Sequence, residues 1–295
     1  MKQLLTISAI CFAGLTFSQS INVTDGNEKF STGSQYALTT TIYENNADDA
    51  ISEWKKVLKD FKYEKVKDSD KEVFGDNILI KEWGNNPVDI YTKFEEDKKA
   101  RTVKMSTAVD LGGTYLTSSD KDKTKLIEKM MKDFAIKMTK EPIAAAVKAA
   151  ERAQEKLEDD QKDLEKDNKN LKEDIEDYKK KITKAEKEII EKDVEIEKKK
   201  GEVHIQKKVV DASSGAVNEQ AKSSKKILEK LEDQLKDLEK DKKNLKEDIE
   251  DNKKKIKKAE EEIKKNEEAQ TKKKTEIDNQ KKVVADVKKK LDAVN

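Results

Sequence analysis

The feature that most constrains the fold is a tandem repeat. Residues 156–210 and 230–284 align without a gap and are identical at about two-thirds of their positions. Duplication of one helical unit therefore accounts for much of the second half of the chain. In both copies, apolar residues recur at alternating spacings of three and four, which predicts a coiled coil. With Leu228 at heptad position a, the seam is partly polar, because the d positions include Tyr178, Lys192, Lys199, Asn252, Asn266, Lys273 and Gln280.

Two arrangements of this coil compete. Helix-weakening residues at 213–226 predict a turn between a first helix at 142–212 and a second at 227–295, which gives an antiparallel hairpin. Placing Ile196 against Leu245 makes every e–e′ contact attractive, including Lys172 with Glu267. A parallel homodimer offers equally many attractive contacts, so the Ser-Ser-Gly sequence at 213–215 is what favours the hairpin. A single charged helix, stabilised only by ion pairs between residues one turn apart, is the third possible arrangement.

The chain begins with a predicted export signal. Residues 1–18 contain one lysine, an apolar run and a small-residue cleavage site, and the run is too short to span a membrane. Cys11 lies in the middle of that run, where a lipid-acceptor cysteine would not be. The sequence therefore predicts a cleaved signal, no integral membrane span in the mature protein, and a periplasmic or secreted location.

Loss of the signal changes both cysteine content and charge. Cys11 is the only cysteine, so the mature chain can form neither a disulfide nor a thiolate site. Removing Lys2 leaves 64 − 1 = 63 basic residues against 63 acidic ones. This balance argues against nucleic acid as a partner.

Residues 20–141 are predicted to fold as a small α+β domain. The expected order is strand, helix, three strands, helix, which implies an antiparallel sheet with both helices on one face. Pro142 is expected to interrupt the last helix and to separate this domain from the coil. The expected strands are 34–43, 72–83, 88–95 and 101–109, with helices around 50–61 and 126–138.

This domain contains no histidine, so acid–base chemistry would depend on carboxylates and tyrosines. Asp89 and Asp110 could form a carboxylate pair, although strand-end acids in solvent are the simpler interpretation. The sequence Asp110-Leu111-Gly112-Gly113 lacks the glycine spacing and lysine of a phosphate-binding loop. His204 falls on the outer face of the coil, without neighbouring ligands. The sequence therefore predicts no catalytic, cofactor-binding or metal-binding residue; the residues considered were Trp54, Trp83, Asp89, Tyr91, Asp110, Tyr115, Ser118, Ser119 and Asp120.

Several phrases resemble an uncharacterised family of exported bacterial proteins. They are the end of the signal, DNILI, NNPVDIY, VDLGGTYL and LEKDNKNLKEDIEDYKKKI. Members of that family pair a small α+β domain with a charged coiled coil, usually with one copy of the coil unit. The resemblance implies this architecture and no activity or site residues.

These observations predict a non-enzymatic exported protein that binds protein partners. Its coil would serve as a structural spacer or binding arm in the cell envelope, and its α+β domain as the specific binding part. A periplasmic holdase-type chaperone is the alternative, and it requires an apolar lining on the arms. A regulator of cell-wall hydrolases is a third hypothesis.

Overall fold

The computed structural model describes residues 20–213 and 219–295. The predicted signal peptide at 1–18, and part of the predicted turn at 213–226, therefore lie outside the described residues. The chain divides into two compact units. The first consists of the described part of Met1–Glu155 together with Asn279–Asn295, and the second is Lys156–Asp278.

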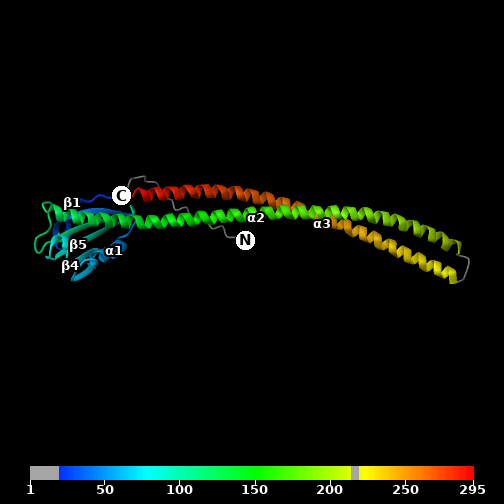
Figure 1. Ribbon diagram of the computed structural model, residues 1–295, viewed down its shortest axis with the longest axis horizontal. Coiled ribbons are helices and arrows are strands. Elements are labelled where there is room, and N and C mark those ends of the chain that lie inside the picture. The colour runs from blue at the N-terminus through cyan, green and yellow to red at the C-terminus, as the bar shows by residue number, and fades with distance from the viewer. Residues whose placement is uncertain (1–19, 214–218) are drawn as a thin grey trace. The chain divides into compact units, whose positions relative to one another are not determined.

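The first unit is built on a six-stranded antiparallel sheet. The strands lie in the order β1-β2-β6-β5-β4-β3. Figure 1 labels β1, β5 and β4 among them. Their bounds are β1 Thr24–Phe30, β2 Gly33–Tyr43, β3 Lys65–Ser69, β4 Glu72–Ile78, β5 Val88–Asp97 and β6 Thr102–Asp110.

The predicted order of strands is incomplete, because β1 and β3 were not expected. Both lie at the edges of the sheet, and both have mostly exposed side chains. Edge strands commonly carry charged residues, which blunt pairing with other chains, so they lack the apolar alternation that identifies a strand in sequence. The predicted strand at 72–83 is also too long, since β4 ends at Ile78 and a short 3-10 helix occupies Lys81–Trp83.

Two helices pack on one face of the sheet, as predicted. Helix α1, Ala47–Lys59, begins after Asn46, whose Oδ1 accepts a hydrogen bond of 2.9 Å from the Asp49 N–H. It contacts β3, β4 and β5 (Figure 1). The first turns of α2, where a helix around 126–138 was predicted, bury an apolar face in the same core; its buried members are Ile127, Met131, Phe134, Ala135 and Met138.

Helix α2 runs without a break from Lys121 to Ala212, and α3 runs from Glu219 to Asp292. The expected interruption at Pro142 is therefore wrong, because Asn45 supplies the hydrogen bond that the proline cannot donate to the Met138 carbonyl. The second helix also begins earlier than the predicted residue 227. Among the described residues, we find no helix with both the length and the apolar character needed to cross a membrane.

The end of α3 belongs to the first unit. Val287 and Val294 are buried in the core that the sheet forms with α1 and α2. The Ile21 N–H donates a 3.1 Å hydrogen bond to the Asn295 carbonyl. Residues from both ends of the described sequence thus complete one core.

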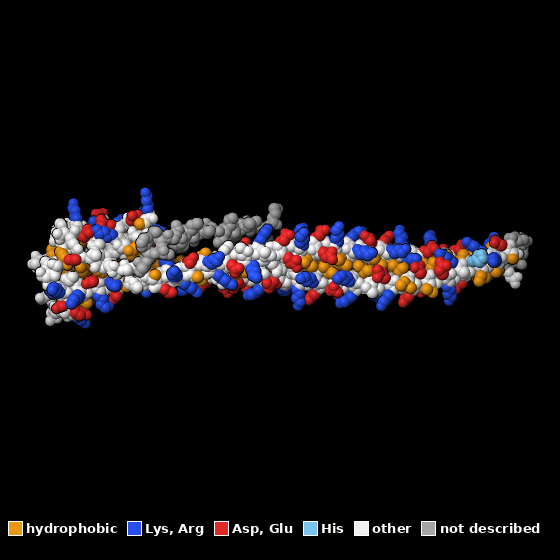
Figure 2. All heavy atoms as spheres, turned by 90° about the horizontal axis from the view of Figure 1, so that it is seen from above, with side chains coloured by type: hydrophobic (Ala, Val, Ile, Leu, Met, Phe, Trp, Pro, Cys, Tyr) orange, Lys and Arg blue, Asp and Glu red, His pale blue; other side chains and the backbone are white. Residues whose placement is uncertain are grey.

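In the second unit, α2 and α3 lie antiparallel and in contact. Lys207 pairs with Glu232 at 2.9 Å near the end of α2, and Asp160 pairs with Lys273 at 3.3 Å near its other end. Every a and d position from Leu157 to Val210 and from Leu228 to Ile277 is buried or half-buried. The long helices are therefore compatible with a coiled coil. Apolar side chains form a band bordered by interspersed acids and bases (Figure 2).

Candidate functional site

Several residues singled out in the sequence meet on the sheet face opposite the helices. Asp89 and Asp110 are directly opposed in the register of β5 and β6. Tyr91 lies two residues along β5 and therefore on the same face, and Tyr115 forms an isolated bridge with Asp110. We call Asp89, Tyr91, Asp110, Tyr115 and the adjacent Phe74 the aromatic–acidic patch.

The two carboxylates hold backbone turns in place. Asp89 Oδ1 accepts a 2.9 Å hydrogen bond from the Asn77 N–H. Asp110 Oδ1 accepts from the N–H groups of Gly112 and Gly113, at 3.0 and 2.6 Å. Both glycines have φ near +98°, which only glycine adopts without strain. Oδ2 of each aspartate makes no hydrogen bond or ion pair with any residue that the structure describes.

The aromatic members of the patch form a row. Phe74 and Tyr91 have ring centroids 4.8 Å apart, and Tyr91 and Tyr115 are 6.3 Å apart. The Tyr115 hydroxyl donates a 2.9 Å hydrogen bond to Thr32 Oγ1. At the other end, the Lys67 ammonium lies over the Phe74 ring, 5.2 Å from its centroid. The row thus already holds one cation in a cation–π contact.

The surroundings of Tyr91 are negative. Burial, followed by Tyr115, Asp89, Asp110 and Glu72, raises the pKa of Tyr91 to about 12. Tyr91 therefore stays a neutral phenol at physiological pH, and its hydroxyl can donate a hydrogen bond but cannot serve as a base. The patch is suited to holding a cation rather than to acid–base catalysis.

Trp54 and Asp120, which were also considered in the sequence, have structural roles. Trp54 is buried, packs edge-to-face on Phe134, and donates a 2.9 Å hydrogen bond from Nε1 to Thr92 Oγ1. Asp120 accepts from the backbone N–H and hydroxyl of Thr117 just before α2, and these bonds lower the pKa of its carboxyl. Trp83 is half-buried, with the Lys123 ammonium 5.7 Å from its ring.

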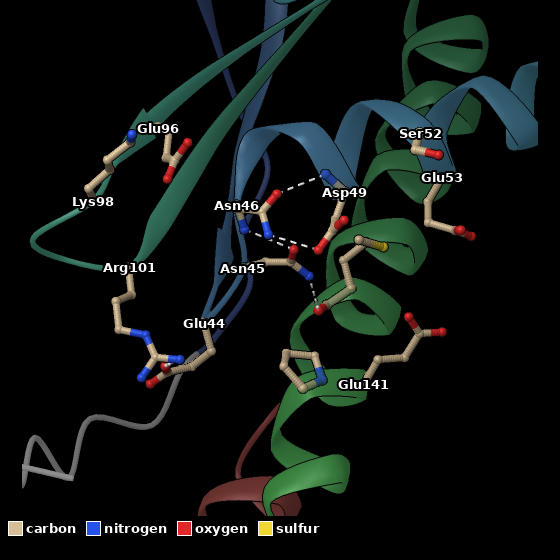
Figure 3. A pocket seen from close by; sticks show the side chains of 12 residues that line it. Glu44, Asn45, Asn46, Asp49, Ser52, Glu53, Glu96, Lys98, Arg101 and Glu141 are labelled. Carbon is tan, nitrogen blue, oxygen red and sulfur yellow. Dashed lines mark hydrogen bonds and ion pairs between the residues drawn. The ribbon is translucent and has the colours of Figure 1, made fainter. Parts of the chain in front are cut away.

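A hollow of about 780 Å³ lies elsewhere in the same unit, and sequence reasoning missed it. Figure 3 shows the β5–β6 hairpin on one side, the start of α1 on another and α2 near Pro142 below. Five carboxylates and two basic groups line it, and the full lining consists of Glu44, Asn45, Asn46, Asp49, Ser52, Glu53, Glu96, Lys98, Arg101, Met138, Glu141 and Pro142. No sequence motif marks this hollow, because its walls come from three separate segments.

Glu44 joins three elements at this hollow. Its carboxylate pairs with Arg101 at 3.1 Å and with Lys290 of α3. The Glu44 N–H also donates to the Arg101 carbonyl at 2.8 Å. Both Glu44 and Arg101 have φ of +55°, a left-handed conformation that is uncommon for residues other than glycine. Together, the two strained residues hold the end of β2 against the β5–β6 hairpin.

Asn45 explains how α2 continues through Pro142. Proline has no N–H, so the Met138 carbonyl, four residues earlier, loses its helical donor. Asn45 Nδ2 donates to that carbonyl at 2.8 Å (Figure 3). Next to it, the Tyr43 N–H donates to Thr139 Oγ1 at 3.1 Å. Asn45, in the connection between β2 and α1, therefore replaces the missing helical donor to the Met138 carbonyl. Helix α2 continues past Pro142 for this reason.

The seam of the second unit contains lysines that face pairs of acids. Lys192 contacts Glu195 on its own helix at 3.1 Å and Asp241 on α3 at 3.8 Å. Lys273 contacts Glu276 at 3.0 Å and Asp160 on α2 at 3.3 Å. In both cases one ammonium at a d position bridges two carboxylates that would otherwise repel each other.

Tyr178 makes the complementary contact. It also occupies a d position, but the two charges beside it are lysines. Lys181 on its own helix and Lys255 on α3 lie 5.5 and 5.7 Å from the ring centroid. The negative face of the ring attracts both ammonium groups. Tyr178 therefore suits a pair of lysines, as the seam lysines suit pairs of acids.

The register of α2 and α3 differs from the predicted one by a heptad. Gln270 Nε2 donates to the Leu164 carbonyl at 3.4 Å, whereas pairing Ile196 with Leu245 would bring Ile277 to Leu164. The predicted contact of Lys172 with Glu267 is nevertheless present, at 3.7 Å. Long side chains lean toward the start of their own helix, so an e–e′ ion pair can form in either register. The contacts of Lys192, Lys273 and Tyr178 across the seam distinguish the observed register from the predicted one.

Part of the outer surface of the second unit is apolar. Ile190, Val194 and Ile205 of α2 are each about two-thirds exposed, at 66, 68 and 66 %. Val209 and Ile227 are also exposed. His204 is exposed, as predicted, and the described part of the chain contains no group of three or more His, Cys, Asp or Glu side chains placed to bind a metal ion.

Comparisons of the chain with protein-family models, with curated proteins and with solved structures give no match.

Proposed function

We propose that the chain is a non-enzymatic exported protein that acts as a structural spacer or protein-binding scaffold in the cell envelope. In this proposal, α2 and α3 form a coiled-coil hairpin built from the two repeat copies, and the α+β domain is the specific binding part. Export rests on residues 1–18, and the expected location is the periplasm or the extracellular space.

The observation that carries the proposal is the complementarity of charged and aromatic side chains along the seam between α2 and α3. Lys192 and Lys273 each bridge two acids, and Tyr178 lies between two lysines. Such matched contacts are expected of two helices that pair with each other in one chain. The seam residues are thereby covered, which suits a hairpin arm.

The α+β domain supports the same reading. Asp89 and Asp110, the acids best placed for catalysis in the sequence, hold backbone amides. Their neighbour Tyr91 has a raised pKa that keeps it protonated. The face offers charge and aromatic surface, which is what a binding site requires.

Two measurements test this proposal. Mass spectrometry of the protein exported by a bacterial host should give a mature chain that begins near Gln19, and retention of residues 1–18 in the cytoplasm would contradict export. Light scattering of the mature chain should give the mass of one chain at micromolar concentration. A trimer or larger assembly would count against the spacer.

The exposed apolar residues of α2 favour a holdase-type chaperone as a second candidate. Ile190, Val194 and Ile205 could contact an unfolded client, which is the apolar lining that this function requires. The test is suppression of aggregation of heat-unfolded citrate synthase. A holdase should lose this activity when the three residues are replaced by serine and keep it in the matched Val283→Ser control on α3. No suppression by the unmodified chain would exclude this candidate.

A further inference from the structure

We propose that the aromatic–acidic patch binds an arginine side chain presented by an extended segment of a partner protein. This inference rests on the proposed function, since it names the group that the α+β domain would recognise. It begins with the opposition of Asp89 and Asp110 across β5 and β6.

Directly opposed like charges on one sheet face repel each other. Here the side chains are about 4.5–5.5 Å apart at Cβ, as in any directly opposed pair. No lysine or arginine that the structure describes forms an ion pair with Asp89 or Asp110. Each aspartate uses Oδ1 for backbone N–H groups and leaves Oδ2 open. A cation between the two carboxylates would remove the repulsion.

The row of rings beside the aspartates selects the kind of cation. Phe74, Tyr91 and Tyr115 are half-buried, so part of each side chain is accessible even though Tyr91 and Tyr115 pack against the buried Phe30. Lys67 over Phe74 shows that a protein cation can lie on this row. Glu72, which also borders the row, already accepts hydrogen bonds from the backbone N–H and the hydroxyl of Ser31. The open acceptors are therefore those of Asp89 and Asp110, next to Tyr91.

Arginine fits this arrangement better than lysine. A guanidinium is planar, stacks on an aromatic ring, and offers several N–H donors in a fixed plane. It can lie on Tyr91 while it donates to the carboxylates on either side. An ammonium can satisfy the charge, but it has no planar face to stack. The β1–β2 turn contacts this face through Ser31 and Thr32, so a partner segment would lie on the part of the face that the turn leaves uncovered.

The experiment uses the full mature chain, labelled with ¹⁵N, and three blocked pentapeptides. Their central residue is arginine, lysine or citrulline, which has nearly the shape of arginine without its charge. We expect amide shifts centred on residues 89–91 and 108–115, at least fivefold tighter binding of the arginine peptide than of the lysine peptide, and weakening by salt. Equal binding of the citrulline peptide, or shifts centred elsewhere, would overturn the inference.

Variants locate the effect. Tyr91→Ala should weaken binding of the arginine peptide at least fivefold, and the matched Tyr63→Ala, at an exposed tyrosine of the same unit, should not. Asp89→Asn combined with Asp110→Asn keeps the Oδ1 acceptors and should weaken binding tenfold or more.

Without peptide, the same double variant should raise the midpoint of thermal unfolding, because the repulsion is gone. A lowered midpoint, or undiminished binding, would show that the pair is not a cation site. Failure of all three peptides to bind would overturn this inference alone, because export and chain mass are measured independently.

Discussion

Asn45 is the residue on which the continuity of α2 depends. Its side-chain amide reaches the Met138 carbonyl, which Pro142 leaves without a helical donor. The proline and the asparagine therefore form one unit, although they lie far apart in the sequence. This coupling gives a prediction that neither residue gives alone.

Asn45→Ala should lower the free energy of unfolding by about 1–2 kcal/mol, because a buried carbonyl loses its donor. In a Pro142→Ala background the new N–H of residue 142 can bond to Met138, so Asn45→Ala should cost much less. Urea denaturation of the four proteins, followed by tryptophan fluorescence, measures the cycle. Equal costs in both backgrounds would contradict the coupling.

Tyr91 gives a prediction about pH. Its pKa, and that of Tyr36, are raised to about 12, in both cases mainly by burial. Because the folded value lies above the unfolded one, the contribution of these phenols to stability is complete below pH 10 and is lost as the pH rises toward 12. Absorbance at 295 nm should show Tyr36 and Tyr91 ionising near pH 12. Tyr91→Phe should remove one of the two.

Some features of single residues could be predicted from the sequence, and others could not. The helices around 50–61 and 126–138 follow local rules of residue spacing, and they were predicted. The meeting of Asp89 with Asp110 depends on the register of two strands, which the spacing of residues along one strand does not specify. The partnership of Asn45 with Pro142 carries no local signal at all.

At the scale of elements, the strongly patterned segments were predictable. The internal strands β2, β5 and β6 alternate clearly, and the repeat gives long helices. The edge strands β1 and β3 were missed because most of their side chains are polar and exposed. The register of α2 and α3 was predicted one heptad away because only e and g charges were compared. The contacts of the polar seam residues determine the register, and these residues are visible in the sequence.

Those seam residues repeat with the duplication. Lys199 bonds to Gln234 at 3.1 Å, and Lys273, its equivalent in the second copy, bonds to Asp160, the equivalent of Gln234. The two copies thus make the same contact in opposite directions, which is local two-fold symmetry. We infer that the seam contacts arise because two copies of the same repeat unit pair with each other.

Lys273→Gln should therefore destabilise the second unit by about 1 kcal/mol at neutral pH, because Asp160 and Glu276 then face each other without a bridge. Lys272→Gln, on the exposed side of the same turn, is the matched control and should change little. Adding Glu276→Gln to the Lys273 variant should restore part of the loss, and circular dichroism during thermal unfolding reports all of these effects. No difference between the two lysines would contradict the role of the seam.

At the scale of the whole molecule, the last residues of α3 complete the core of the α+β unit. Val287 is 7 % exposed within that core, whereas Val283, one turn earlier, is 44 % exposed. Val287→Ala should lower the stability of this unit by about 2 kcal/mol through lost apolar burial, and Val283→Ala should have little effect. Both tryptophans lie in this unit, so their fluorescence reports it selectively. Equal effects would contradict the placement of α3.

The central claim is that α2 and α3 of one chain pair with each other. Cysteines at Leu164 and Gln270, in a mature chain without Cys11, test it most directly, because those residues contact each other across the seam. The account predicts that mild oxidation gives a disulfide within a single chain, and that cysteines at Leu164 and Ile277 react far less. A disulfide-linked dimer as the main product from the first pair, with no intrachain bond, would contradict the hairpin.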